Sequence, residues 1–252
     1  MRQVILVFAL FVVTGALPFG TAQTPSQLQV TPTYYDHKVP LTEALRVIGL
    51  DLKGGFVSFG VDISGETEPE VDINMSDTTL VDALQRITSQ IPGYTSEFVS
   101  EHVVEIYPAK DRADPDDPLN LSIREFSVKD VPATTIFTLP SQYIPELGTY
   151  LSKGHDDRKD GSGPGCGYFV SEMKSDDAPG ITLSLAGRTV RQILDAVAEA
   201  DAVLPALTSS QRLRPYPVGW VHRRRNDAKL GLVHTWSAMS FAPHDWKQYV
   251  AK

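Results

Sequence analysis

VDINMSDTTLVDALQRIT, from Val71 to Thr88, has a near copy 110 positions later in ITLSLAGRTVRQILDAVA, from Ile181 to Ala198. Apolar and polar residues alternate at the start of both stretches, which predicts a half-buried strand. After a short polar turn, apolar residues recur at i, i+3, i+4 and i+7, which predicts a helix with one apolar face. We interpret the two stretches as copies of one strand-turn-helix segment. Chance similarity is the alternative, because this binary pattern is common.

Similar elements surround the two segments. Val39-Pro40 precedes a helical pattern in the first half, and Val131-Pro132 precedes another in the second. Alternating residues at 94–108 and again at 218–239 predict a closing hairpin in each half. The predicted fold is therefore α+β, with two small duplicated units of the order β-α-β-β-α-β-β. In each unit, two helices pack on short mixed sheets.

Composition shifts divide the chain into segments. KDRADPDDP is charged and contains two prolines, which predicts an exposed linker. SKGHDDRKDGSGPGCG is polar and rich in glycine, which predicts a loop. The predicted division is a signal peptide at 1–22, a first unit at 33–109, a linker at 110–118, a divergent second unit at 119–242 that contains the loop 152–167, and a tail at 243–252.

The N-terminal residues have the features of an export signal. Arg2 is followed by a run of apolar residues from Val4 to Leu17, and Gly20 and Ala22 are small residues at the positions before a cleavage site. This pattern predicts cleavage after Ala22 and a periplasmic or secreted protein with no membrane span after cleavage. An uncleaved anchor is the alternative, but a spanning helix needs about 20 apolar residues.

Charge and cysteine content narrow the function classes. The 252 residues carry a net charge of -8, and a negative chain repels the phosphate backbone, so nucleic acid is not expected as a partner. Cys166 is the only cysteine, so an internal disulfide cannot form. The six histidines show no close metal-ligand spacing, and no cofactor motif is present, so neither a metal nor a cofactor is expected.

The motifs of the first copy resemble the short N-terminal domain of secretins and TonB-dependent receptors. The matching residues are VPLTEAL from Val39 to Leu45, VDINM from Val71 to Met75, and TLVDAL from Thr79 to Leu84. The second copy matches more loosely, through Val131-Pro132 and 181–194. The resemblance implies a non-enzymatic periplasmic module that docks partner proteins. The chain is too short for a secretin core or a barrel, so it implies a free-standing version that binds an unknown envelope or periplasmic protein.

The last predicted hairpin contains the residues that we consider for partner binding. They are His222, Arg223, Arg224 and Arg225, which form a basic cluster, and the aromatic residues Trp220 and Trp236. A basic cluster can hold an anionic partner surface, and tryptophans supply large contact areas. The alternatives are a charged hairpin turn that protects a sheet edge and tryptophans that belong to the core.

Two other functions are weighed against this one. The chain could be a small-ligand binder or a hydrolase-type enzyme that uses the loop 152–167 and the C-terminal aromatic residues, with Cys166 as a reactive thiol near His155. It could also be a structural subunit that forms oligomers by pairing strand edges. No catalytic constellation is found in the sequence, so a non-enzymatic role is the expectation.

Overall fold

The computed structural model describes residues 28–30, 34–50, 52–53, 55–75, 77–156, 180–203, 218–228 and 231–240. The predicted signal peptide, Cys166 and the predicted C-terminal tail lie outside the described residues, so the structure does not bear on these predictions. None of the described helices is long and apolar enough to cross a membrane.

Both halves of the chain contain helices and strands. The first half contains β1 (Gln29–Val30), β2 (Tyr34–Pro40), α1 (Leu41–Leu50), β3 (Leu52–Lys53), β4 (Ser58–Ser64), β5 (Glu70–Met75), β6 (Thr78–Thr79), α2 (Leu80–Thr88), β7 (Tyr94–Phe98) and β8 (Val103–Pro108). After the short 3₁₀ helices η2 (Asp111–Ala113) and η3 (Pro118–Asn120), the second half contains β9 (Ser122–Pro132), α3 (Ala133–Thr138), α4 (Pro140–Tyr143), α5 (Pro145–Asp156), β10 (Gly180–Thr189), α6 (Val190–Val203), β11 (Val218–Asp227) and β12 (Gly231–Ser240). The predicted mixed α+β class is confirmed.

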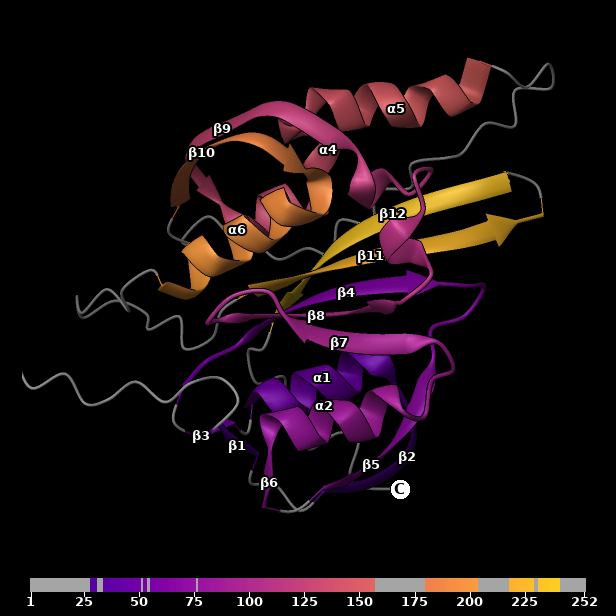
Figure 1. Ribbon diagram of the computed structural model, residues 1–252, viewed down its shortest axis with the longest axis vertical. Helices are drawn as coiled ribbons and strands as arrows, with labels where there is room; N and C mark the ends of the chain where they lie inside the picture. The colour runs from indigo at the N-terminus through magenta and orange to yellow at the C-terminus, as the bar shows by residue number, and fades with distance from the viewer. Residues whose placement is uncertain are drawn as a thin grey trace, which may run out of the picture.

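A central five-stranded sheet contains strands from both halves, in the order β12-β11-β4-β8-β7 (Figure 1). β4 runs parallel to β8 on one side and parallel to β11 on the other. Gly219 is required at the join, because a Cβ atom there would collide with the Phe59 backbone of β4. The expectation that each half packs its helices on a sheet of its own is therefore wrong for the central sheet, since β11 of the second half extends the sheet of the first.

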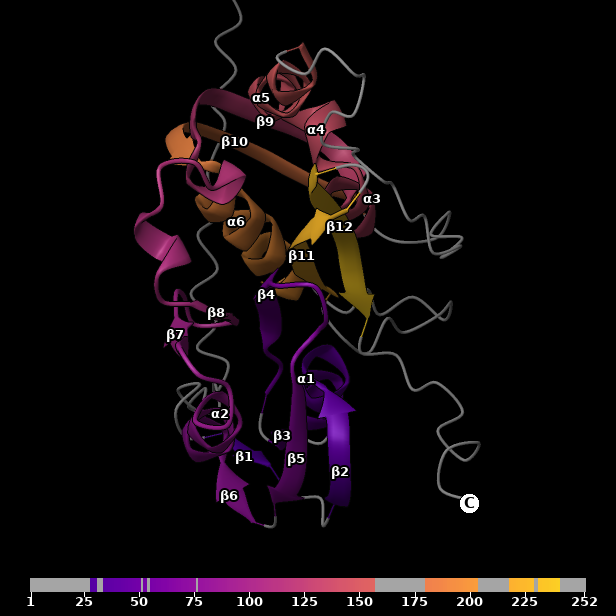
Figure 2. The same ribbon diagram turned by 90° about the vertical axis from the view of Figure 1, so that its right-hand side faces the viewer.

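The helices and the outer strands form layers on the two faces of this sheet (Figures 1 and 2). α1 and α2 pack on one face, and the antiparallel pair β2–β5 covers their outer side. α3 and α6 pack on the other face beneath the antiparallel pair β9–β10. The structure thus contains two hydrophobic cores, one on each face of the shared sheet.

The apolar stripes of the two predicted helices are buried as expected. Leu80, Ala83, Leu84 and Ile87 of α2, and Val190, Ile193, Leu194 and Val197 of α6, are all at most 1% exposed. Both helices also begin with a threonine cap. Thr79 Oγ1 accepts a hydrogen bond from the Asp82 amide, and Thr189 exchanges reciprocal bonds with Gln192. Thr189 and Gln192 therefore form a capping box.

The two outer strand pairs share an irregularity. Two residues of β2 oppose Asp72 of β5, and the second of them, Lys38, has φ of 57° and donates its amide hydrogen to Asp72 Oδ1. Two residues of β9 oppose Thr182 of β10, and the second, Asp130, has φ of 55° and donates its amide hydrogen to Thr182 Oγ1. Each bulge stands just before a Val-Pro pair and the first helix of its half, and such bulges are specific features of a fold.

Three boundary predictions need correction. Helix α5 continues to Asp156, so the predicted loop 152–167 does not begin at residue 152, and residues 157–167 lie outside the described part. The predicted linker 110–118 contains η2, and its Asp111 and Asp117 are buried rather than exposed, because they bond into the fold. The alternative interpretation of the basic cluster as a hairpin turn is wrong, because its four residues lie in strand β11, which extends to Asp227.

Candidate functional site

A buried group of charged residues lies where α6 of the second half meets the sheet strands of the first half. β4 alternates, so Phe59, Val61 and Ile63 face α1 and α2, whereas Asp62 faces α6. We call the group the seam cluster. It comprises Asp62, Glu105, Asp117, Arg191, Asp195, His222 and His234.

Arg191 is the central cation of the seam cluster. Its Nη2 atom lies 3.2 Å from Asp62 Oδ2 and 3.8 Å from Asp117 Oδ2. Its Nη1 atom lies 3.6 Å from Glu105 Oε2. The Arg191 side chain is only 3% exposed. Burial disfavours the charged guanidinium, but the surrounding carboxylates outweigh it and raise the pKa of Arg191.

Two histidines continue the cluster towards the β11–β12 hairpin. His222 Nδ1 lies 2.9 Å from Asp62 Oδ1, and His222 Nε2 lies 3.0 Å from His234 Nδ1. Burial opposes ionisation of Asp62, but the bonds and charges of His222 and Arg191 hold its pKa below the usual value. Burial, followed by the neighbouring His222, lowers the pKa of His234 to about 3. His234 is therefore neutral at physiological pH.

A second branch of the cluster contains two carboxyl groups in contact. Trp220 Nε1 donates a hydrogen bond to Asp195 Oδ1 at 3.0 Å, and Glu105 lies within hydrogen-bond reach of Asp195. Burial and then the Glu105 charge raise the pKa of Asp195 well above its usual value. Two carboxyl groups can share a hydrogen bond only if one is protonated, so this pair favours a neutral Asp195.

Further ion pairs surround the seam cluster. Arg112 bonds to Glu105 and also to Glu97, at 3.1 Å from the latter. Arg224 Nη2 lies 2.7 Å from Asp111 Oδ1, which ties β11 to η2. These ion pairs hold the segment that links the two halves against the central sheet.

The six residues predicted to bind a partner do not form one surface patch in the structure. His222, Trp220 and Trp236 are at most 4% exposed, so they cannot form part of a surface patch, and the interpretation of both tryptophans as core residues is the one the structure supports. Arg224 is engaged with Asp111, and Arg223 forms an ion pair with Glu68 at 2.6 Å. Of the six residues, Arg225 is exposed. The side chain of His155 and all of Cys166 lie outside the described part.

The interactions of the seam cluster connect α6 and β11 to β4 and β8. Arg191 of α6 brings a positive charge to Asp62 of β4 and Glu105 of β8, and His222 of β11 contacts Asp62 through Nδ1. Among the described residues, no group of three or more His, Cys, Asp or Glu residues is placed to hold a metal ion. Sequence reasoning missed Asp62, Glu105 and Arg191. The available signal was Asp62, a lone charge in the apolar strand FVSFGVDI.

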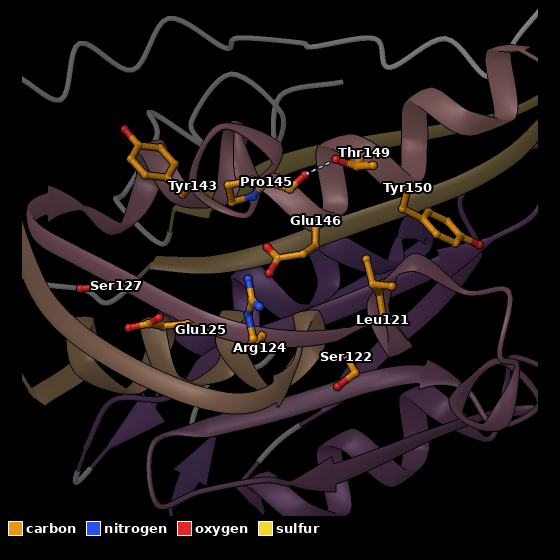
Figure 3. Close-up of a pocket in the computed structure, with 10 residues that line it drawn as sticks. All are labelled: Leu121, Ser122, Arg124, Glu125, Ser127, Tyr143, Pro145, Glu146, Thr149 and Tyr150. Atoms are coloured by element: carbon orange, nitrogen blue, oxygen red, sulfur yellow. Dashed lines mark hydrogen bonds between the residues drawn. The ribbon is translucent and has the colours of Figure 1, made fainter.

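A groove of about 770 Å³ lies between β9 and helices α4 and α5 (Figure 3). It is on the opposite side of the β9–β10 pair from the seam cluster. Its lining residues are Leu121, Ser122, Arg124, Glu125, Ser127, Tyr143, Pro145, Glu146, Thr149 and Tyr150. Figure 3 shows Arg124 of β9 and Glu146 of α5 on facing walls. β9 contributes residues of both its faces to the lining, as expected if the groove follows the edge of the strand.

Comparison with known proteins assigns no function to the seam cluster or to the groove. No protein family model matches the chain, and no curated protein or solved structure matches it. The resemblance to the secretin and TonB-dependent receptor domain therefore stays a prediction from the motifs at 39–45 and 71–84.

Proposed function

We propose that the chain is an exported, non-enzymatic protein-binding module of the bacterial cell envelope. It consists of two copies of one α+β unit, and it docks a partner protein that adds an extended strand along the edge of β9. After removal of residues 1–22 it is periplasmic or secreted.

The duplication is supported by features that the hydrophobic pattern alone does not require. Both halves have a bulge before a Val-Pro pair, at Lys38 and at Asp130, with nearly equal φ angles. Asp72 and Thr182, which receive the bulge amides, occupy matching positions of the two similar stretches. Both second helices have threonine caps and lie between a two-stranded outer pair and the central sheet. Chance similarity would not reproduce this set together.

The docking function is supported above all by the free edge of β9 beside the groove. Within the described residues β9 pairs with β10 alone, so its other edge presents unpaired backbone amides and carbonyls. An added strand lies about 4.8 Å from its neighbour, and a groove between an edge strand and a helix accommodates it. Tyr143 and Tyr150 supply aromatic contacts, and neither Arg124 nor Glu125 forms an ion pair within the described part.

The proposal is tested by filling the groove. A photo-cross-linking residue is placed at Thr149, on the α5 wall, and the mature protein is irradiated with an envelope extract of the producing cells. We expect an adduct with one polypeptide, reduced at least tenfold by Ser127→Trp, because the indole occupies the space of the incoming strand. Ser184→Trp is the matched control, since Ser184 is the cross-strand neighbour of Ser127 but does not line the groove.

Two outcomes would count against this function. One is the absence of any adduct from Thr149. The other is an adduct that persists in Ser127→Trp at the level seen with Ser184→Trp. Both exposed serines tolerate a large side chain without loss of core packing, so circular dichroism of the two variants should match that of the parent protein.

A further inference from the structure

Strand β12 forms one end of the central sheet, and β7 forms the other (Figure 2). All ten residues of β12 pair with β11 in one unbroken antiparallel register. Within the described residues no strand pairs with the other edge of β12. A long and regular edge of this kind presents a row of unpaired backbone amides and carbonyls, so it can accept a further strand along its length.

This edge lacks the features that keep edge strands from pairing, which are charged side chains, proline residues and bulges. β12 has the sequence GLVHTWSAMS, which contains no Asp, Glu, Lys, Arg or Pro. Every other described strand of more than two residues contains at least one Asp, Glu, Lys or Arg. His234, the one titratable residue of β12, is buried and neutral, as described above. β12 is therefore a neutral edge, as expected of a strand that is paired in the working protein.

The two faces of β12 determine which kind of strand can pair with it. Trp236 belongs to the core that contains α3 and α6, and Met239 belongs to the core that contains α1 and α2. An added strand extends the same sheet, so its side chains on each face lie next to such buried residues, where a charge would lose hydration. The strand that fits is therefore one without charged side chains on either face.

A second copy of this chain supplies such a strand, because β12 itself has this composition. A two-fold axis perpendicular to the sheet makes the two β12 strands antiparallel and keeps their like faces side by side. No charge then lies across the new pairing, and the half-buried hydroxyl residues Thr235 and Ser237 of the two copies share one face. The same operation on the short strand β7 brings Glu97 of the two copies close together, which is destabilising.

We propose that the chain forms a two-fold homodimer in which the β12 strands of two copies pair antiparallel and join the two central sheets into one. The contact uses the same edge on both copies, so it closes at two chains and leaves no β12 edge free. The inference is independent of the proposed docking function, since no residue of β12 lines the β9 groove. Where both hold, the dimer presents two β9 grooves, and a partner with two matching strands binds with the gain of a bivalent contact.

The test compares the full mature protein with Thr235→Lys, which places a lysine on the β12 edge. Sedimentation velocity of a dilution series between about 1 and 100 μM measures the dissociation constant. We expect a species of twice the chain mass for the parent protein and a dissociation constant at least tenfold higher for Thr235→Lys, because lysine on an edge strand opposes pairing. Thr95→Lys is the matched control, since Thr95 is a half-buried threonine of the opposite end strand β7, and it should leave the dissociation constant unchanged.

Hydrogen exchange, followed by mass spectrometry, locates the contact. The β12 amides should exchange more slowly in the parent protein than in Thr235→Lys, whereas the β7 amides should exchange alike in both. Thr235 lines a hollow of about 250 Å³ together with Glu66 and Glu68, so the lysine has room and opposite charges beside it, and circular dichroism of the variant should match that of the parent protein. Dilution of the parent protein below its dissociation constant needs no variant and should also speed exchange of the β12 amides.

Three results would overturn the inference. The first is a monomer at every concentration of the series. The second is a dimer that Thr235→Lys leaves intact, or that Thr95→Lys weakens equally. The third is a β12 strand whose amides are equally protected in monomer and dimer, which would mean that the chain itself covers this edge. None of these results alters the Thr149 adduct, so the inference and the proposed function fail separately.

Discussion

Replacement of Arg191 by alanine should lower the free energy of unfolding by about 3–5 kcal/mol, the range found when one partner of a buried ion pair is removed. Arg191 is almost fully buried, and its guanidinium lies between Asp62, Glu105 and Asp117. Without it, these carboxylates are buried with no matching cation at the centre of the cluster. The measurement is urea unfolding of the mature protein, followed by circular dichroism and tryptophan fluorescence.

The control for this variant is Arg86→Ala on α2, which removes an exposed arginine and should change the free energy of unfolding by less than about 0.5 kcal/mol. A further variant separates lost charge from lost packing. Asp62→Asn combined with Arg191→Met removes one charge of each sign, and it should restore part of the stability lost in Arg191→Met alone. Equal losses in Arg191→Ala and Arg86→Ala would show that the cluster does not join the halves.

Asp195→Asn should stabilise the protein at neutral and alkaline pH, by about 1 kcal/mol for each unit by which folding raises the pKa of this carboxyl, because the folded parent protein must keep Asp195 protonated where the unfolded chain ionises it. Because the raised pKa means that the folded protein binds this proton more tightly than the unfolded chain, the free energy of unfolding falls as the pH rises through the folded-state pKa. Asparagine cannot ionise, and its amide can donate to Glu105 while its carbonyl still accepts from Trp220.

The measurement for this variant is the free energy of unfolding as a function of pH from about 4 upwards. The parent protein should lose stability as the pH rises through the folded-state pKa of Asp195, and the variant should lack that part of the slope. Asp116→Asn, at an exposed aspartate, is the control and should keep the parent slope. A variant that is less stable than the parent at neutral pH would contradict the assignment of a neutral Asp195.

The main helices and strands of the first half could be predicted from the sequence because burial on one face leaves a periodic pattern, whereas α4 and α5 of the second half were not predicted. The alternation at 71–75 and the stripe from Leu80 to Ile87 predict β5 and α2 correctly. The pairing of β4 with β11 could not be predicted in the same way. Alternation determines which face of a strand is buried, but it does not determine which neighbour the strand edge takes.

The seam cluster was missed for a related reason. A charged residue in a helix pattern is normally read as solvent-exposed, and Arg191 lies outside the apolar stripe of α6. It is buried because the first half of the chain covers that side of the helix, which is a tertiary effect. The interpretation of 222–225 as a surface patch failed similarly, since β11 is an interior strand of the sheet in which His222 contacts Asp62 and Arg224 pairs with Asp111.

Native-state hydrogen exchange of the mature protein tests most directly whether the seam cluster and the β4–β11 pairing join the two halves into one cooperative body. The slowest amides of α2 and β8 should exchange with the same opening free energy as the slowest amides of α6 and β9, equal to that of global unfolding. If the slowest amides of α6 and β9 open at a free energy lower by more than about 2 kcal/mol, the halves unfold independently and the joint described above does not exist.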